Sequence, residues 1–220
     1  MHVMLAGVGT TQDMIFTEEL NTRLTLLDVR RLDSGVVLLS YDPAREGEGV
    51  MDYHGLVKRL QVPDGYIAPS ELSYHDIRAH AISRADLDDD VRGINASLDI
   101  IRRTRGGGWP TSPVTADYNF VDLVWHECEF RDGGSFTYAV YDASGQYLGC
   151  CYLYPLGGRT PLTADLLRYD VDVSWWVTPA AYQQGHYQEL YQALQHWIST
   201  AFPFQAAYYS NTEITPQANT

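Results

Sequence analysis

The 220-residue chain is predicted to adopt an α/β fold of the α+β kind. Its centre is a mixed, mostly antiparallel sheet with helices on both faces, preceded by an N-terminal extension. Two observations predict this architecture. Residues 170–211 read as a strand, a sharp turn at Thr178-Pro179, a long amphipathic helix and a second strand over 205–210. Residues 72–154 read as a strand, two helices and a hairpin.

The N-terminal extension is predicted to cover residues 1–70. Within it, residues 23–29 and 35–41 alternate in polarity on either side of a turn sequence, which predicts a hairpin. Residues 53–60 predict a short helix. We find no catalytic motif in this extension.

The larger domain is predicted to span residues 71–220. The turn-forming sequence Val62-Pro63-Asp64-Gly65 marks the boundary before it. Residues 74–82 are expected to form its first strand. Ser83 is a good N-cap and Asp86 stands at the third helical position, so a long helix is expected to follow.

A glycine-rich loop interrupts the helical region. Gly106-Gly107-Gly108 ends the first helix, and Trp109 follows directly as an aromatic side chain on that loop. Residues 117–130 predict the second helix. Residues 135–141 and 147–154 predict a hairpin, because two alternating segments flank a turn sequence.

The strand predicted over residues 170–177 presents acidic side chains on one face. Asp170, Asp172, Ser174 and Trp176 share that face, and apolar side chains share the other. Two carboxylates on one face tend to raise the pKa of one of them, which suits a proton acceptor. The alternative is an exposed strand face with both acids in solvent.

The spacing Val-x-Pro-x-x-Tyr-x-x-Gly-x-Tyr-x-x-Leu over residues 177–190 resembles the acyl-CoA-binding element of the GNAT superfamily of N-acetyltransferases. The family pattern is Val-x-Pro-x-x-Arg-Gly-x-Gly-x-Gly/Ala-x-x-Leu. This chain departs from it with Tyr182, Gln183 and Tyr187 at the arginine and two of the glycine positions. The resemblance covers roughly residues 72–211 and implies a central sheet of GNAT type.

The resemblance is incomplete at the C-terminal end. Nine residues follow Asn211, too few for the last helix and two closing strands of the family. The tyrosine that often serves there as general acid toward the leaving thiolate has no counterpart. We expect the N-terminal extension to complete the sheet instead.

The resemblance implies acetyl-CoA or another acyl-CoA as cofactor. The N-terminus of a helix suits a pyrophosphate, because its first N–H groups are unpaired and carry partial positive charge. The implied cofactor-binding residues are Val177, Thr178, Gln184, Gly185, His186, Tyr187 and Asn211.

Tyr187 replaces a glycine of the family pattern with a large ring. It stands in register with Leu190, Leu194 and Trp197, which predicts that it packs in the core beneath the loop. The alternative is that the ring blocks acyl-CoA in the pose usual for the family.

Three residues are catalytic candidates. In the family, a carboxylate on the strand before the Pro turn relays a proton from the attacking amine, which implies Asp170 or Asp172. His126 is the third, because Asp122 precedes it by four residues and can orient its imidazole. No metal site is predicted.

An aromatic acceptor pocket is predicted beside these groups. Aromatic rings suit a flat, apolar or cationic ligand, and the alternative for each ring is simple core packing. The predicted substrate-binding residues are Trp109, Glu129, Tyr152, Trp176 and Tyr209.

Composition narrows the partners and the compartment. The net charge of −13 argues against nucleic-acid or anionic-membrane surfaces and is compatible with a cationic substrate. No segment reads as a membrane span or signal peptide. Cys128, Cys150 and Cys151 show no metal spacing and no even framework, so we expect reduced thiols in a cytoplasmic protein.

Two functions are consistent with the sequence. The first is an acyltransferase that moves an acyl group from acyl-CoA to a small-molecule amine. The second is a protein of the same fold that no longer uses acyl-CoA and binds another ligand, or catalyses a different reaction, in the same cleft. A homodimer with the N-terminal extension as its arm is a third possibility.

Overall fold

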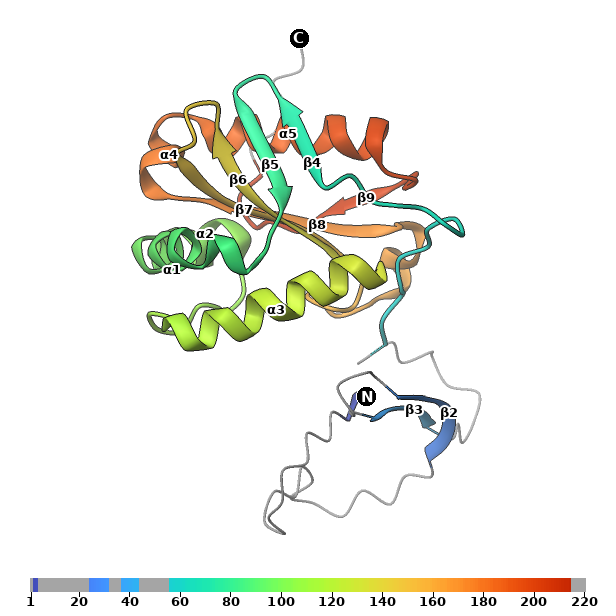
Figure 1. Ribbon diagram of the computed structural model, residues 1–220. Helices are drawn as coiled ribbons and strands as arrows, with labels where there is room; N and C mark the ends of the chain where they lie inside the picture. Colours follow the sequence, from blue (N-terminus) through green and yellow to red (C-terminus); the bar gives the residue numbers. More distant parts are fainter. Residues whose placement is uncertain (1, 4–23, 32–36, 44–55, 215–220) are drawn as a thin grey trace. The chain divides into compact units, whose positions relative to one another are not determined.

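The computed structural model describes residues 2–3, 24–31, 37–43 and 56–214 of the chain. They belong to two compact units, Met1–Leu56 and Val57–Thr220 (Figure 1).

In the first unit, β1 (His2–Val3), β2 (Leu24–Arg31) and β3 (Val37–Pro43) form an antiparallel sheet in the order β1-β3-β2. The pairing of β2 with β3 confirms the predicted hairpin.

A six-stranded sheet forms the centre of the second unit. All neighbouring strands are antiparallel except the last two, which are parallel, so the predicted mixed, mostly antiparallel sheet is confirmed. None of its strands precedes Glu71, and the expectation that the N-terminal extension completes this sheet is wrong for the described residues. In sheet order the strands are β4 (Glu71–Tyr74), β5 (Ile77–Ala81), β6 (Phe136–Asp142), β7 (Tyr147–Tyr154), β8 (Val171–Val177) and β9 (Ala207–Tyr209).

Helices cover both faces of the sheet (Figure 1). Three of them, α1, α2 and α3, pack on one face, and α5 packs on the other. Within the described ranges, every helix is too short or too polar to cross a bilayer. The helix bounds are α1 (Leu87–Ala96), α2 (Leu98–Arg105), α3 (Ala116–Asp132), α4 (Pro179–Gln183) and α5 (His186–Ala201), with short 3₁₀ turns at Arg84–Asp86 and Ala164–Arg168.

Short interruptions change three of the predicted elements. The strand predicted over residues 74–82 is β5, and a turn at His75 and Asp76, with a left-handed φ of 49° at His75, pairs it with β4, which was not predicted. The first long helix breaks at Ser97, whose backbone is not helical, into α1 and α2. The long amphipathic helix predicted after the Pro turn is interrupted at Gln184 and Gly185, and Gly185 takes a left-handed φ of 89° as the N-cap of α5.

Residues 57–70, predicted as part of the N-terminal extension, belong to the second unit and pack within it. Lys58 forms an isolated antiparallel bridge with Leu156, so the predicted helix over 53–60 is absent from its described part, residues 56–60. Tyr66 donates a hydrogen bond to the carbonyl of Ala201. That residues 71–220 form a domain by themselves stays a prediction.

The strand β8 divides the core into two clusters, as its alternation predicts. Trp175 is fully buried among the side chains facing α5, and Trp176 is fully buried among those facing α1, α2 and α3. In the neighbouring β7, Cys151 and Cys150 point to these two clusters in the same way, and both are free thiols. The sheet is therefore buried on both faces at its centre.

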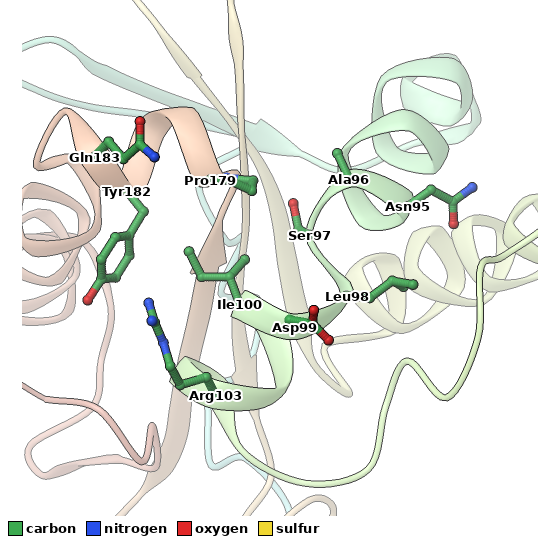
Figure 2. A pocket seen from close by; sticks show the side chains of 10 residues that line it. All are labelled: Asn95, Ala96, Ser97, Leu98, Asp99, Ile100, Arg103, Pro179, Tyr182 and Gln183. Carbon is green, nitrogen blue, oxygen red and sulfur yellow. The ribbon is translucent and has the colours of Figure 1, made fainter.

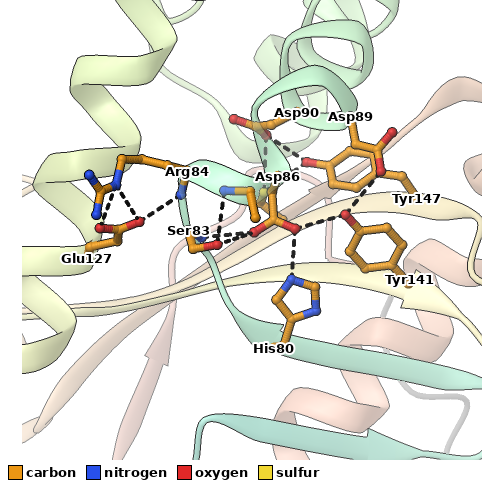
Figure 3. A network of polar contacts seen from close by, with 11 residues as sticks. His80, Ser83, Arg84, Asp86, Asp89, Asp90, Glu127, Tyr141 and Tyr147 are labelled. Carbon is orange, nitrogen blue, oxygen red and sulfur yellow. Dashed lines mark hydrogen bonds and ion pairs between the residues drawn. The ribbon is translucent and has the colours of Figure 1, made fainter.

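A polar network joins the start of α1 to the sheet (Figure 3). The predicted capping box is confirmed: Asp86 accepts a hydrogen bond from the backbone N–H of Ser83, and the Ser83 hydroxyl accepts from the first turn. The same carboxylate contacts the His80 ring nitrogen at 2.8 Å and accepts from the Tyr141 hydroxyl at 3.0 Å. The Asp86 side chain thus fixes both the helix start and β5.

This network predicts a pH-dependent stability. The hydrogen bond from His80 to Asp86 raises the pKa of His80 above 6.5. The contribution of protonated His80 to the free energy of unfolding is therefore complete below pH 6.5 and is lost as the pH rises through the raised pKa. The pKa of Asp86 lies below 3.8, because hydrogen bonds from His80 and Ser83 outweigh its burial, and its contribution is lost as the pH falls through that lowered value.

We expect Asp86→Asn to reduce the free energy of unfolding by about 1–3 kcal/mol at pH 5.5. The reduction should be smaller at pH 8.5, because the stabilisation from protonated His80 is lost as the pH rises through its raised pKa. Urea unfolding of both proteins at the two pH values measures this, and an equal reduction at both would contradict the assignment.

Candidate functional site

The strands β8 and β9 separate after a short parallel pairing. They pair over Val171–Val173 and Ala207–Tyr209, and Ser210 then donates its N–H to the carbonyl of Val173. Beyond this point the edge of β8 from Trp175 to Val177 has no β9 strand beside it. We call this the β8–β9 divergence.

Asn211 fills the divergence with its side chain. Its carboxamide oxygen accepts from the N–H of Trp175 at 3.1 Å, and its nitrogen donates to the carbonyl of Trp175 at 2.9 Å. The same nitrogen contacts the Tyr187 hydroxyl at 2.6 Å. The backbone groups of Trp175 are therefore paired with a side chain.

Tyr187 lies in the core below the start of α5, so its predicted packing is confirmed. It is buried, and its ring centroid lies 5.3 Å from those of both Trp175 and Tyr182. Its hydroxyl donates to the carbonyl of Glu213. Burial raises the pKa of Tyr187, so the hydroxyl stays protonated and can donate.

The turn after β8 leads into two helix N-termini, those of α4 and α5. Thr178 caps α4, and its hydroxyl accepts from the N–H of Ala181. The N–H groups of Gln184 and Gly185 are already bonded to carbonyls within α4. The first N–H groups of α5, those of His186 and the residue after it, have no intrahelical partner by position.

Gly185, the residue before these N–H groups, is exposed, and a Cβ built on it would meet no atom within 4 Å. The His186 ring contacts the carboxylate of Glu189 at 3.1 Å and is largely buried, whereas Gln184 is exposed. The two residues directly before α5 are therefore exposed.

A groove of about 630 Å³ runs between α2 and α4 (Figure 2). We call it the α2–α4 groove. Arg103 points across it toward the Tyr182 ring, with the guanidinium carbon 4.9 Å from the ring centroid. Its lining residues are Asn95, Ala96, Ser97, Leu98, Asp99, Ile100, Arg103, Pro179, Tyr182 and Gln183.

Asp172 is the most buried acid of the predicted site. Its side chain is 1% exposed, and neither oxygen has a hydrogen-bond partner among the described residues. Burial raises the pKa of its carboxyl above the usual value. The hydroxyls of Ser210 and Thr160 are near enough to offset this in part. The guanidinium groups of Arg159 and Arg105 also lower the pKa of the Asp172 carboxyl.

Arg105 lies on the same face of the sheet. Its Nε donates to the hydroxyl of Ser174 at 3.1 Å, and its guanidinium carbon stands 3.8 Å from the Tyr152 ring centroid. The Trp109 ring is 6.0 Å away. Arg159 is held beside it through the Arg105 carbonyl. Two guanidinium groups thus stand on the same face of the sheet as the Asp172 carboxyl, so this cluster carries charges of both signs.

Asp170 occupies a different environment at the start of β8. Its carboxylate accepts from the N–H groups of Gln205 and Ala206, both at 2.9 Å, and stands 3.7 Å from the Lys58 ammonium. These contacts hold the entry to β9 against β8. These contacts indicate a structural role for Asp170, so Asp172 is the stronger candidate for the general base.

His126 lies buried between α3 and the sheet. One ring nitrogen contacts the Thr137 hydroxyl at 3.1 Å, and the other stands 3.5 Å from Asp122, so the predicted pair is confirmed. Its ring is stacked with that of Tyr154 and tilted against that of Tyr152, with centroids 6.4 and 6.1 Å away. Both nitrogens are engaged, which fits a residue that positions the aromatic cluster.

The predicted aromatic pocket is brought together only in part. Trp109, Tyr152 and Trp176 lie on the face of the sheet that carries Arg105, and the Trp176 ring donates to the Tyr152 hydroxyl at 2.9 Å. Tyr209 packs on the opposite face against Trp175. The Glu129 carboxylate lies against Gly134, beyond the end of α3.

Several residues at the site carried no clear signal in the sequence. Arg105 directly precedes the three glycines, and Tyr182 stands where the GNAT pattern has an arginine. Neither position indicates in the sequence which residue its side chain contacts. Arg103, Arg159 and Glu213 reach the site from separate segments, and only the tertiary structure brings them together.

No family model matches the sequence, and no curated protein matches it. Solved structures of GNAT-family ribosomal-protein N-acetyltransferases are similar to the chain in fold. RimL, a ribosomal L7/L12 alpha-N-protein acetyltransferase in complex with coenzyme A, is 10% identical with a TM-score of 0.45, over 61% of this chain and 68% of its own.

Two further structures are similar to the same extent. The ribosomal-protein-S5-alanine acetyltransferase from Vibrio fischeri is 11% identical with a TM-score of 0.46, over 60% of this chain and 69% of its own. The Salmonella typhimurium acetyl transferase that modifies the N-terminal serine of 50S ribosomal subunit protein L7/L12 is 9% identical with a TM-score of 0.44, over 59% and 68%.

Proposed function

We propose that the second unit transfers an acyl group from acyl-CoA to an amine. The observation that carries this proposal is the β8–β9 divergence, where strand edge, Pro turn and helix start follow one another within the segment that resembles the GNAT element. A strand edge can pair with amides of a bound arm, and a helix start can bind phosphates.

The start of α5 would hold the phosphate end of the cofactor. Its first N–H groups follow the exposed Gly185, and Arg103 lines the adjoining groove as a cation, which supports this placement. The arm of the cofactor fits only if the Asn211 carboxamide leaves Trp175, because it occupies both backbone groups there.

Asp172 is proposed as the general base. Bound acyl-CoA would supply the thioester carbonyl that the amine attacks. A carboxyl with a raised pKa is better matched to proton transfer near neutral pH than an exposed one. Asp172 would accept the proton of the attacking amine, directly or through one water, and Tyr152 and Trp109 would wall the acceptor side.

The acceptor is proposed to be a small-molecule amine. Protein N-terminal amino groups, on which the similar solved structures act, form the other class to be tested. A cytoplasmic location and a homodimer stay predictions.

A second candidate is a protein of this fold that no longer uses acyl-CoA. The bonds of Asn211 to Trp175 favour it, because they satisfy the strand edge without any ligand. The two candidates differ in a single measurable property, the binding of coenzyme A.

Gly185→Trp tests the phosphate site. We expect the parent protein to bind acetyl-CoA with a Kd on the order of micromolar, and the variant to lose this binding, because the indole would cover the start of α5. Calorimetric titration with acetyl-CoA and free coenzyme A measures both.

Gly107→Trp is the matched control. Gly107 has a φ of 80° against 89° for Gly185, and neither has any atom within 4 Å of a Cβ, so backbone strain is comparable. The control should bind acetyl-CoA like the parent. Equal binding by both variants would place the phosphates elsewhere, and absence of binding by the parent would support the second candidate.

A further inference from the structure

Asn211–Glu213 forms a bridge between the sheet and the helices. We call it the strap. Asn211 is bonded to β8, Thr212 to the end of α2, and Glu213 to side chains of α2, α4 and α5. Three consecutive residues thus close the β8–β9 divergence from one side to the other.

The inner end of the strap imitates a peptide group. The Asn211 carboxamide both accepts from and donates to the backbone of Trp175, as a neighbouring strand would, and the side chain is 7% exposed. An amide of a bound acyl-CoA arm would need the same two groups of Trp175. The strap therefore stands where the ligand of the proposed function would lie.

The middle of the strap caps α2. The N–H groups of Thr212 and Glu213 both donate to the Thr104 carbonyl, at 3.0 and 3.2 Å, and the Thr212 hydroxyl donates to the Arg103 carbonyl. The last carbonyls of a helix have no partner within it, so these bonds satisfy them. A Cβ on Gly106 would lie 2.6 Å from the Thr212 methyl, so the glycine makes room for the strap.

At the outer end, the Glu213 side chain is held by exposed groups, whereas its carbonyl accepts from the buried Tyr187 hydroxyl. The Glu213 carboxylate contacts the Arg103 guanidinium at 3.1 Å and accepts from the Tyr182 hydroxyl. Arg103 is 58% and Glu213 36% exposed, and such exposed pairs stabilise weakly. Arg103 and Tyr182 also line the α2–α4 groove, so a ligand in the groove would contact the residues that hold the strap (Figure 2).

We propose that the strap is an intramolecular gate over the acyl-CoA site, an inference that rests on the proposed function. A phosphate that binds Arg103 competes with the Glu213 carboxylate for the guanidinium. Release of the Glu213 carboxylate leaves the outer end held by the single bond from the Tyr187 hydroxyl, and Asn211 can then leave Trp175 to the cofactor arm. The anionic end of the ligand thus opens the position that its amides occupy.

Glu213→Gln tests the gate. Weakening the outer end should raise the fraction of open protein, and the apparent affinity rises with that fraction. Asp99→Asn is the matched control, because Asp99 lines the same groove and its loss removes one negative charge equally. In calorimetric titrations we expect Glu213→Gln to bind coenzyme A about fivefold tighter, or more, than Asp99→Asn. Equal affinities would overturn the gate.

A second readout needs no cofactor. The N–H of Trp175 is protected by Asn211, so hydrogen exchange at this amide should be faster in Glu213→Gln than in Asp99→Asn, while the amides of β7 should exchange alike in both. Exchange at Trp175 that is unchanged overturns the strap as a moving part. If no protein binds coenzyme A, the proposed function fails, and the exchange result alone decides whether the strap opens.

Discussion

Asp172→Asn is expected to lower kcat for acyl transfer by about 10²- to 10⁴-fold, the usual contribution of a positioned general base. The substitution keeps the shape of the side chain and removes its ability to accept a proton. Coenzyme A affinity should stay within about twofold of the parent, since the carboxylate is proposed to act on the amine. Steady-state kinetics at saturating acetyl-CoA, with calorimetry beside it, measures both quantities.

Asp172→Asn should also change how the stability of the protein depends on pH. Because the folded-state pKa of Asp172 is raised above 3.8, the parent loses stability as the pH rises from that value through the raised pKa. Asparagine does not ionise, so Asp172→Asn should be relatively more stable at pH 7 than at pH 3.5. Stability that depends on pH alike in both proteins would contradict the raised pKa.

Asp170→Asn provides the contrasting case. Asp170 holds two backbone N–H groups and stands near Lys58, so its substitution should lower stability and leave kcat of the folded enzyme close to that of the parent. If instead Asp170→Asn loses turnover and Asp172→Asn retains it, the base has been assigned to the wrong carboxylate.

Gly149→Ala is expected to reduce the free energy of unfolding by about 3 kcal/mol or more, the upper range for overpacking. A Cβ at Gly149 would lie 2.2 Å from the Trp176 carbonyl oxygen and 2.8 Å from the Val177 Cα. Both atoms belong to the backbone of β8, so no side-chain rotation can relieve the contact. The change would also push β8 out of place at the edge of the proposed site.

Urea unfolding measures this effect, with Gly108→Ala as control. Gly108 has no atom within 4 Å of a Cβ, so its substitution should change stability by no more than about 0.5 kcal/mol. Comparable stabilities for the two variants would show that β7 and β8 can separate without cost.

Local sequence signals predicted most of the fold. The capping box at Ser83 and Asp86, the alternation along β8 and the Pro turn at Thr178-Pro179 each depend on residues close in sequence, and each is confirmed. Some errors lie in the N-terminal extension, whose predicted helix is absent from residues 56–60 and whose described strands do not join the six-stranded sheet, and others lie where one or two residues interrupt an element. His75 and Ser97 are not strong turn or break signals by themselves, so the β4–β5 hairpin and the α1–α2 junction were missed.

The site was predictable along one segment and not across segments. The register of Tyr187 with α5 predicted its burial correctly, because helical periodicity is a local property. The pairing of Asn211 with Trp175 bridges 36 positions, and that of Glu213 with Arg103 joins α2 to the far end of the chain. No periodicity or spacing carries such contacts, so the strap became visible only in three dimensions.

Amine-dependent release of free coenzyme A thiol from acetyl-CoA tests most directly whether the second unit moves an acyl group from acyl-CoA to an amine. The protein would be incubated with acetyl-CoA and either small-molecule amines or peptides with a free N-terminal amino group, and acetylated products identified by mass spectrometry. We expect thiol release that requires an amine, persists in Gly107→Trp and is lost in Gly185→Trp and Asp172→Asn. Absence of release with every acceptor, together with absence of coenzyme A binding in both the parent and Glu213→Gln, would contradict the account and leave a protein of this fold that uses another ligand.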